Sequence, residues 1–179
     1  FDEVWHRLRA GTDMASLRAV AWDGRTPEQV LDAVLAEELD VLTDDRGRSF
    51  AQSYGATIND KGYLNYFRAP EHCEAWQALS PFRGRTFGTV NLNRHLKDTY
   101  RQDELHRAQR LYKRSVPPPL GAERITLGDK VVNLVNRAAN AWSPTGGKTK
   151  GYIANGEIGV VIGQLSSKFT PKRTQIEFG

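Results

Sequence analysis

Three segments near the C-terminus decide the fold: GDKVVNLVNR at residues 128–137, YIANGEIGVVIGQL at 152–165, and TQIEF at 174–178. Each segment alternates apolar with polar residues, which is the pattern of a strand with one buried face. Asn155 and Gly156 fall between two such runs, where a tight turn with positive φ is expected. The segments together predict a small, twisted antiparallel barrel over residues 124–179.

The composition is that of an ordinary globular protein. Of the 179 residues, 39% are hydrophobic and 26% are charged, which excludes a disordered or fibrous chain. No apolar run approaches the roughly 18 residues needed to span a bilayer, and the single cysteine, Cys73, excludes an internal disulfide. We therefore expect a cytoplasmic protein with no membrane partner. A chain that starts at Phe1 and stops at Gly179 is expected to be a piece of a longer polypeptide.

Charge is divided unevenly along the chain. Residues 1–81 hold 8 Lys/Arg against 14 Asp/Glu, a net charge of −6, whereas residues 82–179 hold 17 against 7, a net charge of +10. A basic half is expected of a surface that meets phosphates, although a solvated surface also produces one. The acidic run is interpreted as a solvated helix face and loop rather than a metal site. It comprises Glu37, Glu38, Asp40, Asp44 and Asp45.

The first two thirds of the chain predict two strand–helix units. Residues 17–22 read as a strand, and Thr26, Pro27 and Gln29 then form the capping signature of a helix. The mixed sequence of residues 46–75 predicts a loop that contains a short hairpin or helix. Residues 75–80 read as a second strand, followed by a Gly/Arg-rich loop and a helix that begins near Thr89. Two consecutive units of this kind favour a parallel sheet.

Basic residues then recur at helical spacing in two successive segments. The first set is Arg94, Lys97 and Arg101, and the second is Arg107, Arg110 and Arg114. Prolines 117–119 predict a stiff linker and a boundary within residues 115–123, which divides the chain into domains at 1–120 and 121–179.

Residues 138–151 read as a loop that carries an aromatic side chain beside lysines. Trp142, Lys148 and Lys150 suit base stacking and phosphate contact with a single strand. The alternative is a surface loop whose tryptophan packs on the barrel.

No motif indicates a self-sufficient active site. Gly147-Lys148-Thr149 is no phosphate loop, because the glycine required five residues earlier is replaced by Trp142. His72 and Cys73 have no further ligands at metal-binding spacing, and Ser80 is not in a nucleophile elbow. We therefore expect no catalytic residue and no metal site.

Four stretches resemble, in order and separation, the second motor domain of superfamily 1 DNA helicases of the RecD-like and UvrD-like kind. They are WQALSPFRGRTFGTVNLNRHL at 76–96, ITLGDKVVNLVNR at 125–137, YIANGEIGVVIGQL at 152–165 and IEF at 176–178. The resemblance covers residues 75–179. It implies an α/β fold in which residues 1–120 are part of the second RecA-like motor domain, with its parallel-sheet layer. Residues 121–179 would be the SH3-like β-barrel inserted into that domain, with Gly128, Asp129, Val131 and residues 155–159 as its signature.

The resemblance also implies a function, as a fragment of an ATP-dependent DNA helicase. Residues 79–83 resemble helicase motif IV, so Arg83, with Gln77, would help to hold ATP phosphates. Single-stranded DNA would be contacted by Arg94, Lys97, Arg101, Trp142, Lys148 and Lys150.

Cofactor and partners follow from the same resemblance. ATP and Mg²⁺ belong to the parent protein, because this chain has no Walker A or Walker B motif and is expected to be inactive alone. The expected partners are single-stranded DNA and the remaining motor domain. The alternative is a structural brace or protein-interaction module whose exposed barrel face is apolar and whose Trp142 lies in a protein contact.

Overall fold

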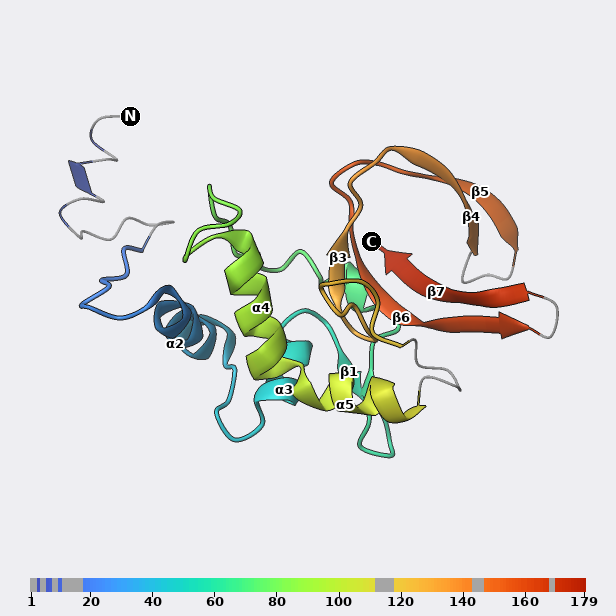
Figure 1. Cartoon of the computed structure of the whole chain (residues 1–179), viewed down its shortest axis with the longest axis horizontal. Helices are drawn as coiled ribbons and strands as arrows, with labels where there is room; N and C mark the ends of the chain where they lie inside the picture. Colours follow the sequence, from blue (N-terminus) through green and yellow to red (C-terminus); the bar gives the residue numbers. More distant parts are fainter. Residues whose placement is uncertain are drawn as a thin grey trace.

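The computed structural model describes residues 18–111, 118–142, 147–167 and 170–179, together with residues 3, 6, 7 and 10. Helices and one short β-hairpin form the first part of the chain, and the longer strands form the last part (Figure 1). The helices are α2 (Pro27–Leu39), α3 (Arg46–Gln52), α4 (Thr89–Tyr100), α5 (Gln102–Leu111) and the 3₁₀ turn η1 (Ala69–Glu71). The strands are β1 (Thr57–Ile58), β2 (Leu64–Asn65), β3 (Lys130–Val132), β4 (Arg137–Trp142), β5 (Lys148–Ile153), β6 (Ile158–Ser167) and β7 (Thr170–Phe178). Arg114 and the start of the predicted linker lie outside the described residues.

Helix α2 starts as its capping signature predicts. The Thr26 hydroxyl accepts a hydrogen bond from the Gln29 backbone N–H at 3.3 Å, and the Gln29 side chain accepts one from the Thr26 N–H at 2.9 Å. Pro27 occupies the first turn, where its missing N–H costs nothing. Both reciprocal bonds of a capping box are therefore present.

Removing this cap gives the first testable prediction. We expect Thr26→Ala to lower the free energy of unfolding by about 1 kcal/mol, because an orphan backbone donor loses its acceptor. Urea denaturation measures the change. Thr43→Ala is the control, since the Thr43 hydroxyl bonds only to the exposed neighbouring Asp44 side chain. Equal stability of the two variants would contradict the role of the cap.

The sheets correct the prediction of a parallel layer. All strand pairs in the described residues are antiparallel, in a β1–β2 hairpin, a three-stranded sheet of order β3-β6-β7 and a separate β4–β5 pair. The expected strands at 17–22 and 75–80 are irregular wherever the structure describes them. Arg18, in the first of these two segments, forms ion pairs with Glu37 and Glu38 on α2. The fold is mixed α and β, with no closed barrel among the described strands.

Helices and sheet share one hydrophobic core. Phe50 of α3 stacks on Tyr100 of α4 at a ring distance of 4.8 Å, and Leu35 of α2 is buried in the same cluster. Val160 of β6 joins these residues from the sheet side. Because an apolar face of β6 is covered by helical residues, the three-stranded sheet is held against the helices by burial of apolar surface.

The Asn-Gly turn is confirmed, but it does not close a hairpin. Gly156 has a φ of +95°, and its backbone N–H donates to the Asn133 carbonyl at 2.8 Å. The Asn133 side chain donates in turn to the Ala154 carbonyl at 2.7 Å. The turn links β5 to β6, and these strands belong to different sheets. Asn155 and Gly156 therefore serve the chain reversal between the two sheets.

Candidate nucleic-acid interface

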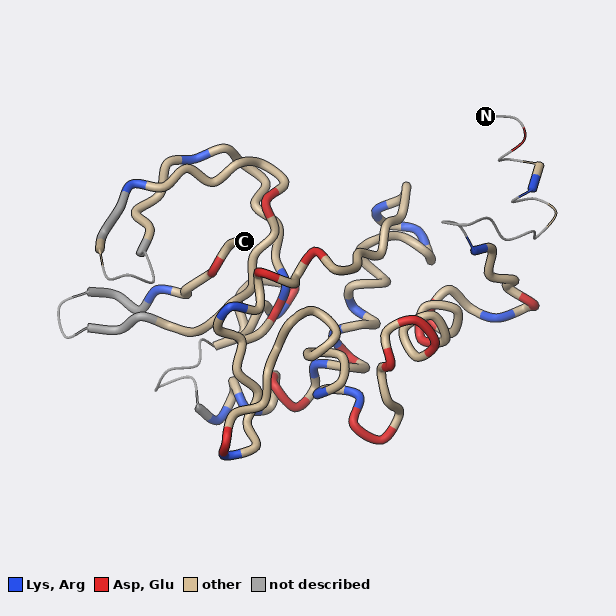
Figure 2. The backbone as a smooth tube through the Cα atoms, turned by 180° about the vertical axis from the view of Figure 1, so that it is seen from behind, with Lys and Arg blue, Asp and Glu red and all other residues tan. Residues whose placement is uncertain are grey.

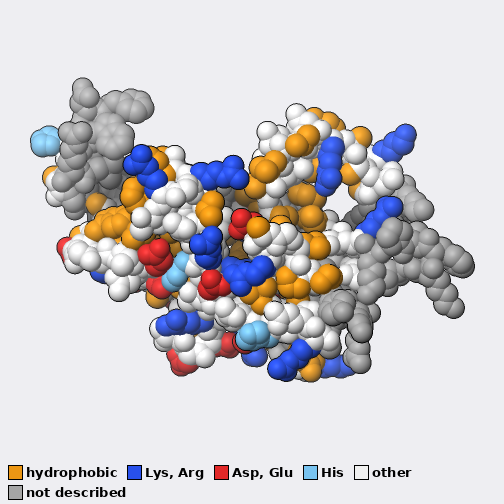
Figure 3. Space-filling view, viewed as in Figure 1, with side chains coloured by type: hydrophobic (Ala, Val, Ile, Leu, Met, Phe, Trp, Pro, Cys, Tyr) orange, Lys and Arg blue, Asp and Glu red, His pale blue; other side chains and the backbone are white. Residues whose placement is uncertain are grey.

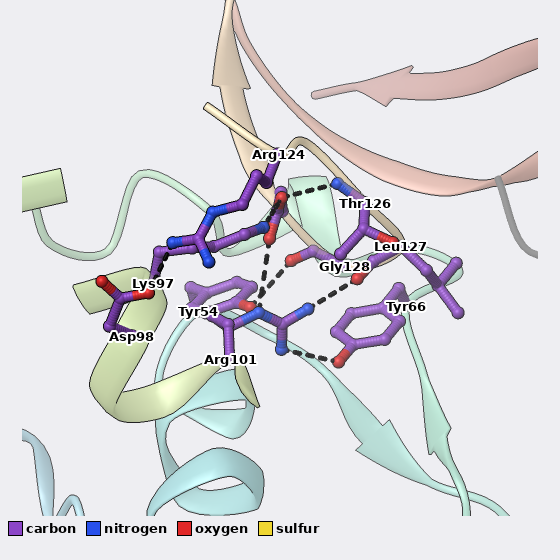
Figure 4. Close-up of polar contacts among 10 residues, drawn as sticks. Tyr54, Tyr66, Lys97, Asp98, Arg101, Arg124, Thr126, Leu127 and Gly128 are labelled. Atoms are coloured by element: carbon purple, nitrogen blue, oxygen red, sulfur yellow. Dashed lines mark hydrogen bonds and ion pairs between the residues drawn. The ribbon is translucent and has the colours of Figure 1, made fainter. Parts of the chain in front are cut away.

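The basic stripe predicted on α4 is not an exposed stripe. Arg94 is exposed, but Lys97 and Arg101 retain only 7% and 3% of their accessible surface. The prediction that these two cations meet a nucleic acid therefore conflicts with their burial. Both side chains point across to the segment that leads into β3 (Figure 4).

Asp129 forms ion pairs with both of these cations. Its carboxylate pairs with the Lys97 ammonium and, at 3.4 Å, with Arg101 Nε, and it accepts a third hydrogen bond from the Thr126 backbone N–H at 2.7 Å. The Asp129 side chain is 12% exposed, and a largely buried carboxylate with this set of donors is well compensated for its loss of water. Asp129 thus fixes the start of β3 to the C-terminal end of α4.

Two tyrosines complete this buried group, which we call the Asp129 joint (Tyr54, Tyr66, Lys97, Arg101 and Asp129). Arg101 donates to the Tyr66 hydroxyl at 2.9 Å and to the Leu127 carbonyl at 2.6 Å, while Tyr54 donates to the Gly128 carbonyl at 2.8 Å. Burial raises the pKa of Tyr66 to about 12, so its hydroxyl stays neutral at physiological pH. The joint is a hydrogen-bonded structural contact rather than a binding surface.

Lys97 shows the electrostatic cost of this arrangement. Burial lowers the pKa of the Lys97 ammonium, and the nearby Asp129 carboxylate opposes that shift. A cation in this position depends on its partner for its charge. No sequence spacing identifies the pair, because Lys97 and Asp129 are 32 residues apart.

The predicted loop at 138–151 is largely strand. Trp142 ends β4, Lys148 begins β5, and these two residues are paired directly in the antiparallel register. Lys150 pairs with Asn140, and Tyr152 with Ala138. Residues that are paired across two strands lie on the same face of the sheet. The three residues predicted to contact single-stranded DNA therefore occupy register positions on one face of the β4–β5 pair, which we call the β4–β5 ribbon. Residues 143–146, between the two strands, lie outside the described residues.

Burial along the ribbon follows the same alternation. Ala138, Asn140, Lys150 and Tyr152 are exposed, with Tyr152 at 65%, whereas the alternate positions 139, 141, 151 and 153 are half-buried. Gly151 belongs to the half-buried face, where an added Cβ would lie 3.2 Å from the Ala141 Cβ. Tyr152 and Asn140 are not among the residues predicted from the sequence. The alternation of Lys148, Lys150 and Tyr152 with smaller residues is a signal that could identify Tyr152, whereas Asn140 is identified only by its pairing with Lys150.

The ribbon arches away from the three-stranded sheet. Figure 1 shows β4 and β5 curving over β6 and β7, and Figure 3 shows a hollow below the arch with Lys and Arg side chains around it. The ribbon pairs with no other strand in the described part of the chain. The backbone tube in Figure 2 has acidic residues around α2 and α3 and also at the base of the arch, whereas strands β4 and β5 themselves contain Lys and Arg but no Asp or Glu. The exposed face of the ribbon is therefore basic and aromatic.

The two predicted nucleotide-contacting residues lie elsewhere. Arg83 is exposed in the loop before α4, and Gln77 is exposed in the irregular segment that precedes it. Ser80 shapes this loop, because its hydroxyl donates to the Phe87 carbonyl at 2.7 Å. The Phe82 and Phe87 rings pack edge to face at 5.1 Å.

Loop carbonyls also close the start of α4. The Thr89 N–H bonds to the Phe82 carbonyl at 3.0 Å, and the Val90 N–H bonds to the Arg83 carbonyl at 3.1 Å. These helix amides are occupied, so an anion at this loop would meet the Arg83 side chain and not a cradle of free N–H groups. The predicted site residues thus occupy four places: the segment and loop before α4 (Gln77 and Arg83), the exposed side of α4 (Arg94), the Asp129 joint at the far end of α4, and the β4–β5 ribbon.

Comparisons with protein-family models, curated proteins and solved structures found no match. Within the described residues, no helix has the length and apolar character of a membrane span, and no cluster of His, Cys, Asp and Glu has the arrangement of a metal site.

Proposed function

We propose that this chain is part of a superfamily 1 DNA helicase and contributes contacts to single-stranded DNA. In this proposal the helical part belongs to the second motor domain, and residues 121–179 correspond to its SH3-like insertion. The observation that carries the DNA-binding part is the exposed face of the β4–β5 ribbon, where Lys150 and Tyr152 lie two residues apart.

The chemistry of that face suits an unpaired strand. Single-strand binding combines aromatic rings, which stack on bases of any sequence, with cations that follow the phosphates. Tyr152 supplies an exposed ring and Lys150 an exposed cation, and the register adds the positions of Trp142 and Lys148 to the same face. We place the DNA contacts on these four residues and Arg94, and not on the buried Lys97 and Arg101.

The proposed ATP contact is limited to side chains. Arg83 has the exposed guanidinium that a phosphate contact needs, with Gln77 nearby in sequence. Because the first amides of α4 bond to loop carbonyls, this chain offers no amide cradle there for the ATP phosphates. The remaining motor domain of the parent protein would hold ATP and Mg²⁺ and supply the hydrolytic chemistry.

Fluorescence anisotropy with labelled oligothymidylate at several salt concentrations tests DNA binding. For a single strand, log Kobs falls with log salt by about 0.7 for each phosphate contact. We expect Lys150→Ala to weaken binding and to reduce this slope by about 0.7. Tyr152→Ala is expected to cost about 1–3 kcal/mol of binding free energy with the slope unchanged, because the ring stacks but carries no charge.

The matched control for these variants is Arg48→Ala. Arg48 is an exposed cation on α3, paired only with Asp45 at 3.3 Å. We expect this variant to bind like the wild type, with the same salt slope. Absent or salt-insensitive binding, or equal effects of Lys150→Ala and Arg48→Ala, would contradict the proposal.

One observation favours the alternative of a protein-interaction module. The end of β3 and the segment that joins it to β4 expose Val132, Leu134 and Val135, at 52%, 74% and 67%. An apolar strip of this kind is a feature of protein contacts. If oligothymidylate binding is absent while Leu134→Glu abolishes association with the rest of the parent protein, this second function replaces the first.

A further inference from the structure

Helix α5 carries a basic stripe that the Asp129 joint leaves exposed. Its apolar face is buried through Leu105 and Ala108, at 3% and 0% exposure. The other side presents His106, Arg107 and Arg110, which fall within one turn of the helix. Unlike Lys97 of α4 and Arg101 just after it, these groups are not used to attach the sheet.

The stripe lines a shallow hollow. Its walls are Asp103, His106, Arg107 and Arg110, which we call the α5 hollow. Figure 3 shows Lys, Arg and His side chains gathered at the lower edge of the molecule, over α5. Within the part of the chain that the structure describes, His106 and Arg110 have no hydrogen-bond or ion-pair partner. Two of its basic groups are thus open to a ligand, while Asp103 lines the same hollow and Glu104 pairs with Arg107.

An aromatic ring lies beside one of these cations. The Arg107 guanidinium lies over the Tyr63 ring, 5.5 Å from its centroid, and also pairs with Glu104 at 3.7 Å. Tyr63 precedes β2 and is 57% exposed, so much of its surface remains open. The backbone of this hairpin is fixed, because the Asn59 side chain accepts hydrogen bonds from the Lys61 and Tyr63 N–H groups, both at 3.0 Å.

The spacing of these groups indicates the ligand. Three basic side chains around one small hollow match a compact anion of high charge, and a phosphate monoester carries about −1.5 to −2 at pH 7. The carboxylates of an acidic peptide are single charges spread along a chain. An exposed ring beside the cations adds a stacking surface for a base. We propose that the α5 hollow binds a nucleotide, with its phosphate on His106, Arg107 and Arg110 and its base against Tyr63.

The source of the nucleotide is either a free nucleoside monophosphate or a residue within a strand. Isothermal titration calorimetry of the chain with AMP, inorganic phosphate and a 5′-phosphorylated thymidine tetranucleotide separates these sources. If AMP binds most tightly, the ligand of the α5 hollow is a free nucleotide. If the tetranucleotide binds most tightly, the ligand is a nucleotide within a nucleic-acid strand. We expect Arg110→Ala to weaken all three ligands about tenfold or more, because a charge-assisted hydrogen bond is lost.

Variants of the ring and of the ribbon complete the test. Tyr63→Ala should weaken AMP about fivefold or more and leave inorganic phosphate unchanged, because only AMP carries a base. Arg48→Ala and Lys150→Ala should bind AMP like the wild type, so this site stands or falls independently of the β4–β5 ribbon. Circular dichroism confirms that each variant is folded. Absence of saturable AMP and tetranucleotide binding, an Arg110→Ala variant equal to the wild type, or tighter binding of a tetra-aspartate peptide would overturn the proposal.

Discussion

Asp129→Asn is expected to lower the free energy of unfolding by about 3–5 kcal/mol. The change removes the negative charge that Lys97 and Arg101 share, so two cations that are only 7% and 3% exposed lose the carboxylate that they contact. Removing one partner of a buried ion pair has an effect of this size, because the remaining charge has been taken out of water without compensation. Urea denaturation followed by circular dichroism measures it.

Asp98→Asn is the matched control. Asp98 lies on the same helix as Lys97 and pairs with Arg124, but both side chains of this pair are more than 40% exposed. Exposed pairs contribute little, so we expect a change of less than about 1 kcal/mol. If the two variants are equally stable, Asp129 does not anchor the sheet to α4.

The contrast between these two aspartates explains which predictions succeeded. Thr26 and Gln29 satisfy each other across three residues, so the start of α2 is encoded locally and is confirmed. The start of α4 at Thr89 is confirmed as well. The burial of Lys97 depends on Asp129, whose position follows from the packing of distant elements. Helical spacing alone treats Lys97 and the exposed Arg94 as equivalent.

The strand predictions also succeed or fail according to whether distant parts of the chain are involved. Residues 158–165 form β6, as predicted, but their alternation is interrupted: the adjacent Val160 and Val161 are both fully buried, so both faces of the strand are covered there. Residues 76–80 have a similar apolar content but form no strand, and Leu79 is 86% exposed. A short apolar run becomes a strand only where a partner strand pairs with it, and such partners are tertiary information.

The sequence singles out three residues of the ribbon but not the structure that holds them. Proline and glycines around Trp142, Lys148 and Lys150 predict a loop, whereas the structure pairs these residues in β4 and β5. The pairing adds Tyr152 and Asn140 to the same face. Larger and smaller side chains alternate in both strands, before and after residues 143–146. The alternate positions hold alanine, glycine and other small residues, however, so the strands lack the apolar pattern by which a strand is usually predicted.

Gly128→Ala is the second variant for which we expect a large effect, a loss of about 2–5 kcal/mol of unfolding free energy. Gly128 has a φ of +79°, and a Cβ added there would lie 2.2 Å from Tyr66 Cζ and 2.6 Å from an Arg101 guanidinium nitrogen. The left-handed backbone alone costs an alanine about 1–2 kcal/mol. The remainder comes from moving the Tyr66 ring, which would also break its hydrogen bond with Arg101.

Gly121→Ala separates these two contributions. Gly121 also has a positive φ, of +64°, but an added Cβ would meet no atom within 4 Å. This control therefore carries the backbone cost without the steric clash, and we expect it to lose only about 1–2 kcal/mol. The excess loss in Gly128→Ala, measured by urea denaturation, reports the close approach of the chain to Tyr66 and Arg101. Equal losses at the two positions would show that Gly128 is required only for its φ, and that the Asp129 joint tolerates a side chain there.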